Sequence, residues 1–214
     1  MKKQKVVYEY KVKTIDYLKA LAQYPNFLKL INIEDKPYKE IIEWVLQKET
    51  SLQDDSFVTP SVKTLSEEIG MDYAKVTKYL KYIYFEIIDL NNKHPELFVR
   101  QGQMKCYFGF KYFESSHTFI LGMDYLPRIE EHFTFNFINP ILGNSSFYVQ
   151  QVWHDYEHSG HSVIFTMVPR LPYKYMALLK EKAYLNRDIS FHEFYDFERN
   201  SELEEKLLKL YKTL

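Results

Sequence analysis

The sequence predicts an α+β protein, in which a helical N-terminal domain precedes a small antiparallel β-barrel-like domain with C-terminal helices. Three observations predict this class. Between residues 14 and 90, apolar residues recur at the three- and four-residue spacing of amphipathic helices. Between 104 and 168, short runs rich in aromatic and β-branched residues alternate with turn clusters, which is typical of strands. Helical spacing returns from 172 to 214.

Composition and charge narrow the class of function. The 214 residues are 46% hydrophobic and 27% charged, which is typical of a soluble globular protein. A formal net charge of −1 excludes binding of nucleic acid through overall basicity, although residues 1–30 hold seven lysines against Glu9 and Asp16. Cys106 is the only cysteine, so an intrachain disulfide is excluded. We find no secretory signal and no apolar run long enough to span a membrane, and we therefore expect a cytoplasmic protein.

The first elements are a strand and two helices. Residues 5–12 alternate as expected for a strand, and residues 14–23 follow with helical spacing. Pro37 suits the first turn of a further helix, which we expect to run to about Lys48. The apolar face of that helix is formed by Ile41, Ile42, Val45 and Leu46. A polar linker then covers residues 49–60.

Residues 61–85 predict two short helices joined by a tight turn. Gly70 suits the end of the first helix, because a turn there commonly requires a positive φ angle. Asp72 is placed to cap the second helix, which we expect to continue to about Leu90. The apolar positions follow helical spacing and are Leu65, Ile69, Met71, Val76, Leu80 and Ile83. This is the layout of a helix-turn-helix.

A candidate hairpin follows the second helix. Residues 97–101 and 104–108 have strand-like composition and flank a Gly-Gln turn at 102–103. Together, the helices and this hairpin resemble the winged-helix DNA-binding proteins over residues 37–110. The resemblance implies a winged helix-turn-helix domain at 1–112, with the second helix as the DNA-reading element and the hairpin as the wing. It implies double-stranded DNA as the partner of a bacterial-type transcriptional regulator or of a replication protein of a mobile element.

The exposed side of the second helix supplies the candidate DNA contacts. With Val76, Leu80 and Ile83 directed toward the core, three lysines fall on the solvent side and form a local positive stripe. Lysines hold phosphates, and a threonine or a tyrosine reaches base edges or sugars. The candidate wing adds two cations. The candidate DNA-binding residues are therefore Lys75, Thr77, Lys78, Lys81, Tyr82, Arg100 and Lys105.

An alternative to DNA binding stays open. The same helix face is explained by a solvated surface in a winged helix that serves only as a scaffold for protein interactions. The aromatic content of 17% is compatible with a contact surface as well as with a Tyr-rich core. Under either hypothesis, a homodimer or a protein partner would engage the β domain.

The second predicted domain covers residues 113–214. Strands are expected, beginning at the end of the first domain, near 104–113, 117–123, 131–138, 146–154 and 161–168. The segment from 118 to 168 resembles small SH3-like barrels, which serve many functions.

Helices are expected to close the chain. Pro172 suits the start of a helix that runs to Tyr184, and capping boxes at Ser190–Glu193 and Ser201–Glu204 predict two further helix starts. A leucine stripe on the last helix predicts packing on the barrel, with a dimer seam as the alternative; it consists of Leu203, Leu207, Leu210 and Leu214.

Histidines gather between the fourth and fifth predicted strands. If His154 ends one strand and His161 begins the next, the two face each other, with His158 in the loop. Imidazoles and carboxylates in such a hairpin suit zinc or iron, but the spacing matches no established motif and we favour a polar hairpin tip without metal. No catalytic template occurs in the sequence, and Cys106 lies in an apolar strand typical of a buried, unreactive thiol. We therefore expect a non-enzymatic protein without catalytic residues, cofactor or metal.

Overall fold

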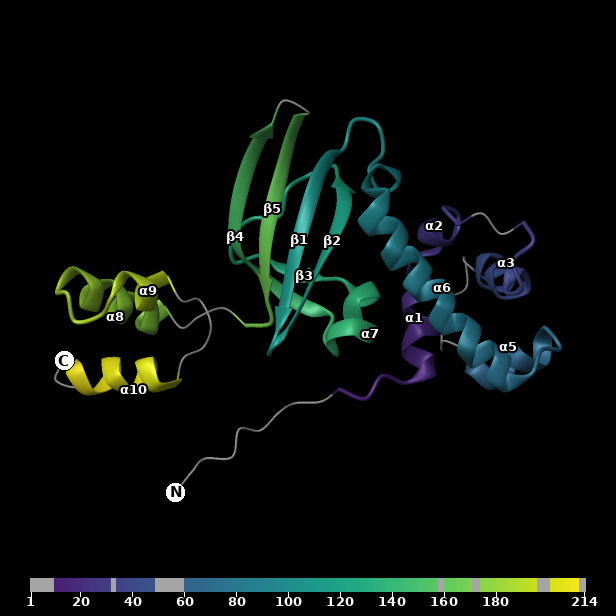
Figure 1. Ribbon diagram of the computed structural model, residues 1–214, viewed down its shortest axis with the longest axis horizontal. Coiled ribbons are helices and arrows are strands. Elements are labelled where there is room, and N and C mark those ends of the chain that lie inside the picture. The colour runs from purple at the N-terminus through teal and green to yellow at the C-terminus, as the bar shows by residue number, and fades with distance from the viewer. Residues whose placement is uncertain are drawn as a thin grey trace, which may run out of the picture. The chain divides into compact units, whose positions relative to one another are not determined.

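A computed structural model of the chain describes residues 10–31, 34–48, 60–157, 160–170, 174–195 and 201–211 (Figure 1). These residues form a mixed α+β structure, which confirms the predicted class. The chain divides into a first unit, Met1–Pro169, and a second unit, Arg170–Leu214. This boundary differs from the one expected at 112–113. The expected boundary falls in the turn between two paired strands.

The first unit begins with helices that the spacing of apolar residues predicts. Helices at 14–23 and near 37–48 are confirmed, and the helix expected to end at Leu90 continues for almost one further turn. The predicted strand at 5–12 falls largely outside the described residues, as does the linker at 49–60. The helices are α1 (Thr14–Gln23), α2 (Pro25–Leu28), α3 (Lys39–Gln47), α5 (Val62–Glu68) and α6 (Tyr73–Lys93).

The turn between α5 and α6 has the geometry that its sequence predicts. Ser61 caps α5, because its hydroxyl accepts a hydrogen bond of 3.0 Å from the Thr64 N–H. Gly70 ends the helix with a φ of 65°, in the left-handed region that glycine adopts without strain. The Asp72 carboxylate then caps α6 by accepting bonds of 3.0 and 3.2 Å from the backbone of Ala74 and Lys75. Both predicted roles, at Gly70 and at Asp72, are confirmed.

Five strands form one curled sheet in the order β2-β1-β5-β4-β3 (Figure 1). The strands are β1 (Met104–Tyr112), β2 (Ser115–Met123), β3 (His132–Thr134), β4 (Ser146–Glu157) and β5 (Gly160–Val168). The expected all-antiparallel arrangement is wrong in one pair, since β1 and β5 run parallel. This pairing stacks Phe108 on Phe165 in the core, with ring centroids 4.8 Å apart. Such a contact compensates for the long loop that parallel pairing requires.

The expected hairpin at 97–108 is not formed, and this prediction is corrected. Pro95 begins a short 3-10 helix, η1 (Pro95–Phe98), so residues 97 and 98 are not extended. Phe98 is buried between the rings of Phe27 and Phe119, at 5.2 and 5.6 Å. β1 pairs with β2 instead. Burial of one aromatic ring therefore outweighs the strand-like composition of this segment.

Helix α6 is anchored to the β-rich part of the first unit at two points, only one of which lies in a strand. Its Tyr84 is fully buried, stacks on Phe137 at 4.9 Å and donates a hydrogen bond of 2.8 Å to the Phe137 carbonyl. Phe137 lies in a second 3-10 helix, η2 (Asn136–Ile138), which is followed by α7 (Asn139–Leu142). Near the C-terminal end of α6, the Asn91 amide bonds the backbone of Ile120 in β2. The position of α6 is therefore fixed by η2 and β2.

The second unit has its own small core. It comprises α8 (Lys174–Leu185), α9 (Phe191–Tyr195) and α10 (Ser201–Leu210). The predicted capping box at Ser190 is confirmed, because Glu193 accepts a bond of 2.7 Å from the Ser190 N–H. This bond, a second one from the Ser190 hydroxyl and a third from the Lys206 ammonium lower the pKa of Glu193 to about 2. The residues buried in this core are Leu179, Ala183, Ile189, Leu203 and Leu207.

The leucine stripe of α10 packs within the second unit, beside Leu179 and Ala183 of α8, so the predicted packing on the barrel is corrected. Leu203 and Leu207 are buried, but Leu210 is 48% exposed. Leu214 and the side chain of Ser201, with its predicted capping box, lie outside the described residues.

Candidate nucleic-acid interface

The exposed face of α6 carries most of the predicted DNA contacts. Val76, Leu80 and Ile83 are fully buried, and helical periodicity directs the opposite face to solvent. Lys75, Lys78, Lys81 and Tyr82 lie on that face and are all exposed, as the sequence predicts.

Two of the three lysines of this face, Lys78 and Lys81, lie beside aromatic rings. The Lys78 ammonium lies 5.4 Å from the centroid of the Tyr82 ring, and that of Lys81 lies 6.0 Å from the Phe85 ring. In the part of the chain that the structure describes, no carboxylate pairs with Lys75, Lys78 or Lys81. Lysines without a carboxylate partner attract an external anion such as a phosphate.

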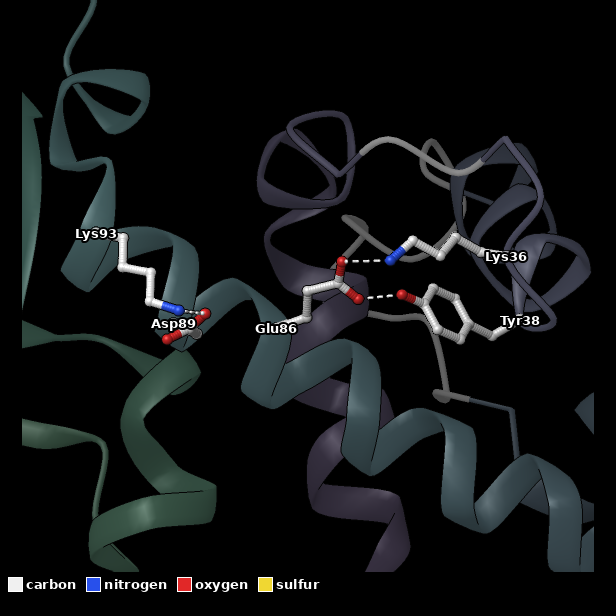
Figure 2. A network of polar contacts seen from close by, with 5 residues as sticks. All are labelled: Lys36, Tyr38, Glu86, Asp89 and Lys93. Carbon is white, nitrogen blue, oxygen red and sulfur yellow. Dashed lines mark hydrogen bonds and ion pairs between the residues drawn. The ribbon is translucent and has the colours of Figure 1, made fainter.

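The carboxylates in the C-terminal half of α6 form ion pairs with lysines outside the exposed row (Figure 2). Glu86 accepts a hydrogen bond from the Tyr38 hydroxyl and pairs with the Lys36 ammonium at 3.2 Å. Asp89 pairs with Lys93 at 2.8 Å. The bond to Glu86 raises the pKa of Lys36, which therefore stays cationic beside that carboxylate. Both negative charges of this half-helix are thus matched by a neighbouring lysine.

Thr77 does not lie on the lysine face. Its side chain is half-buried, and its hydroxyl is buried without a hydrogen-bond partner in the structure. The hydroxyl is thus directed into the protein.

Two lysines that the sequence reasoning missed lie beside the start of α6. An open hollow of about 460 Å³ lies between the beginnings of α1 and α5, and Lys13, Lys63 and Tyr73 are among its lining residues. Tyr73 is 51% exposed at the first position of α6, so the hollow lies beside the start of that helix. The excess of lysines in residues 1–30 was the available signal for Lys13, but it does not place that residue in space.

Arg100 and Lys105 are not brought to the same surface. Both follow the C-terminus of α6, and the fifteen-residue rise from Lys78 to Lys93 is about 22 Å. Lys105 belongs to β1 and places its ammonium 5.0 Å from the centroid of the Tyr107 ring. The structure therefore divides the predicted contacts into a group on α6 and a separate pair.

The histidines of the β4–β5 hairpin face each other, as the sequence predicts. His154 Nδ1 and His161 Nε2 are 2.9 Å apart, and the Tyr156 ring stacks on that of His161 at 4.3 Å. His158 lies outside the described residues. Among the residues the structure places, no group of three or more His, Cys, Asp or Glu side chains is arranged to hold a metal.

Cys106 is fully buried in β1, as its apolar surroundings predict. Burial raises the pKa of its thiol to about 12, so the reactive thiolate does not form near neutral pH.

Comparison with protein-family models, with curated proteins and with solved structures finds no match. None of the helices in the described ranges is both long and apolar enough to cross a membrane.

Proposed function

We propose that this protein is a non-catalytic binder of double-stranded DNA that uses α5, Gly70 and α6 as a helix-turn-helix. The observation that carries the proposal is the exposed row of Lys75, Lys78 and Lys81 on α6, which no described carboxylate neutralises. An exposed helix of this kind fits the major groove, and its lysines contact the phosphates on either side.

The proposed mode of binding is mainly electrostatic. The exposed face of α6 offers lysines and Tyr82 but no arginine or asparagine, which are the usual readers of base edges. Arg100 and Lys105 do not form a wing beside it, so the winged-helix resemblance is carried by the helices alone. We therefore propose modest, strongly salt-dependent affinity, suited to a transcriptional regulator or a mobile-element replication protein of the bacterial cytoplasm.

Charge reversal on α6 tests the proposal. The triple variant Lys75→Glu, Lys78→Glu, Lys81→Glu is expected to weaken binding of a labelled mixed-sequence duplex by at least about tenfold at low salt. Because each phosphate contact contributes about 0.9 to the slope of log K against log salt, that slope should fall by about 2.7. Fluorescence anisotropy between about 50 and about 200 mM salt measures both quantities.

The matched control places the same number of charge reversals away from α6. Lys39→Glu, Lys111→Glu and Lys209→Glu change exposed lysines of α3, β1 and α10. Equal loss of affinity in this control would mean that only net charge matters, and the proposed interface would be rejected. Absence of salt-dependent duplex binding by the wild type would reject DNA binding itself.

A second candidate is a protein-interaction module in which the helix-turn-helix is only a scaffold. It is favoured by an apolar row on the face of the sheet opposite the core. Cross-strand pairing places Trp153 beside Ile164, Ile164 beside Tyr107, and Tyr107 beside Ile120. Trp153 is 57% exposed and Ile164 38%. Apolar rows of this extent on a sheet surface are typical of contact surfaces.

A further inference from the structure

The end of the β4–β5 hairpin holds two imidazoles in a fixed relation. Tyr156 and His161 are cross-strand partners, and His154 is the partner of Val163 two residues further along. His154 and His161 therefore lie on the same face of the sheet, on neighbouring strands. Their rings are inclined by only 27°, with centroids 5.1 Å apart and the facing nitrogens at 2.9 Å.

This arrangement directs the two facing nitrogens at each other. A centroid separation of 5.1 Å and a nitrogen separation of 2.9 Å mean that the rings meet edge to edge, so one N–H points at the lone pair of the other ring. The Tyr156 ring, inclined by 10° to that of His161, packs on its face and restricts its rotation. The pair is also accessible, since His154 is exposed and His161 half-buried.

A metal ion of the zinc type has matching requirements. Two imidazole nitrogens at about 2.0–2.1 Å from a tetrahedral ion are about 3.3 Å apart, a few tenths of an ångström more than the separation found here. Imidazole is a preferred ligand of Zn²⁺, Cu²⁺ and Ni²⁺. Rotation of the exposed His154 side chain provides this opening and turns its nitrogen toward an ion held beside the His161 nitrogen.

We infer that His154 Nδ1 and His161 Nε2 together bind a divalent transition-metal ion, with water in the remaining coordination positions. The ring that donates in the metal-free pair changes tautomer on binding, because its proton passes through water to its other nitrogen. Both rings then coordinate as neutral imidazoles, and no net proton is released. The site uses no residue of the proposed DNA interface and does not depend on that proposal.

Calorimetric titration of the full chain with zinc chloride tests the inference. One ion per chain is expected to bind, with the side-chain ¹⁵N resonances of His154 and His161 shifting together. Loss of an outer-shell partner of a ligand already weakens metal binding by about 10–100-fold, so His154→Asn or His161→Asn should weaken it by at least about tenfold. Both side chains lie at the exposed hairpin end, and circular dichroism checks that the variants fold.

The matched control is His192→Asn, which removes an exposed histidine from α9 and should leave zinc affinity unchanged. Two results would overturn the inference. One is unchanged affinity in the double variant His154→Asn, His161→Asn, which would place the ion elsewhere. The other is the absence of both heat and resonance shifts in the wild type at millimolar zinc.

Discussion

At the residue scale, Asn91 joins α6 to the sheet. Its side chain is buried, with 1% of its surface exposed. Its amide donates a bond of 2.8 Å to the Ile120 carbonyl and accepts one of 2.9 Å from the Ile120 N–H. β2 is an edge strand, so these backbone groups have no strand partner on that side. The asparagine therefore supplies the two hydrogen bonds that a neighbouring strand would make.

Replacement of Asn91 by leucine is expected to destabilise the protein by about 2–4 kcal/mol. The change leaves the N–H and the carbonyl of Ile120 without partners in a partly buried place, and each such group costs about 1–3 kcal/mol. Urea unfolding measures the free energy. Asn92→Leu is the control, because Asn92 is the next residue and is exposed. Equal stability of the two variants would show that the Asn91 hydrogen bonds contribute nothing.

His117 makes stability depend on pH. Its ring lies half-buried opposite Phe110 in β1, and its Nε2 is buried without a partner in the structure. Desolvation lowers the pKa of His117 below 6.5, because burial disfavours the charged ring. The unfolded state then binds more protons than the folded state between the lowered pKa and about 6.5. The contribution of neutral His117 to stability is complete above that pH window and is lost as the pH falls through it.

Replacement of His117 by phenylalanine is expected to reduce this loss of stability between about pH 7.5 and about pH 5. Urea unfolding of both proteins across the range measures the difference, in which contributions of the other histidines cancel. His192→Asn serves as the control, since it removes an exposed ring. Parallel pH curves for the wild type and His117→Phe would contradict the assignment.

At the element scale, local sequence signals predict the helices well. They fail where a contact with an aromatic ring far away in the chain determines the local structure. Gly70 and Asp72 act within a few residues of their own positions, so the turn between α5 and α6 is readable from the sequence. The segment before β1 is different. Phe98 is buried against Phe27, which lies far away in the chain, and this contact prevents the expected strand. The positions of β1, β2, β4 and β5 were predicted closely, but the strand expected at 131–138 ends at Thr134, because Asn136 begins η2. The parallel pairing of β1 with β5 has no local signal.

The candidate interface likewise has one part that the sequence predicts and another that it does not. Helical periodicity places Lys75 and Lys78 on one exposed face, so that part of the site follows from spacing alone. Spacing does not show which charges of α6 are neutralised, because Glu86 pairs with Lys36, fifty residues away. Thr77 sits at the edge of the helical face, where spacing does not decide whether a hydroxyl points outward. Lys13 was missed because it reaches the site only through the packing of α1.

At the scale of the whole molecule, the two units have separate buried clusters. The first is built from α1, α3, α5, α6 and the inner face of the sheet, whereas the second contains only five buried side chains among its described residues. A small unit buries a small fraction of its surface, so its stability depends strongly on each core residue. The second unit should therefore open at a lower free energy than the first.

Leu207→Ala tests this difference. The side chain is fully buried among Leu179, Ala183 and Leu203, and removal of such a group costs about 2–5 kcal/mol. We expect amide hydrogen exchange to lose its protection across α8 and α10, while α6 and the sheet keep theirs. Leu208→Ala is the matched control, because Leu208 follows in the same helix and is 39% exposed. Simultaneous loss of protection in α6 would show that the two units unfold as one, since a shared core is the condition for such coupling.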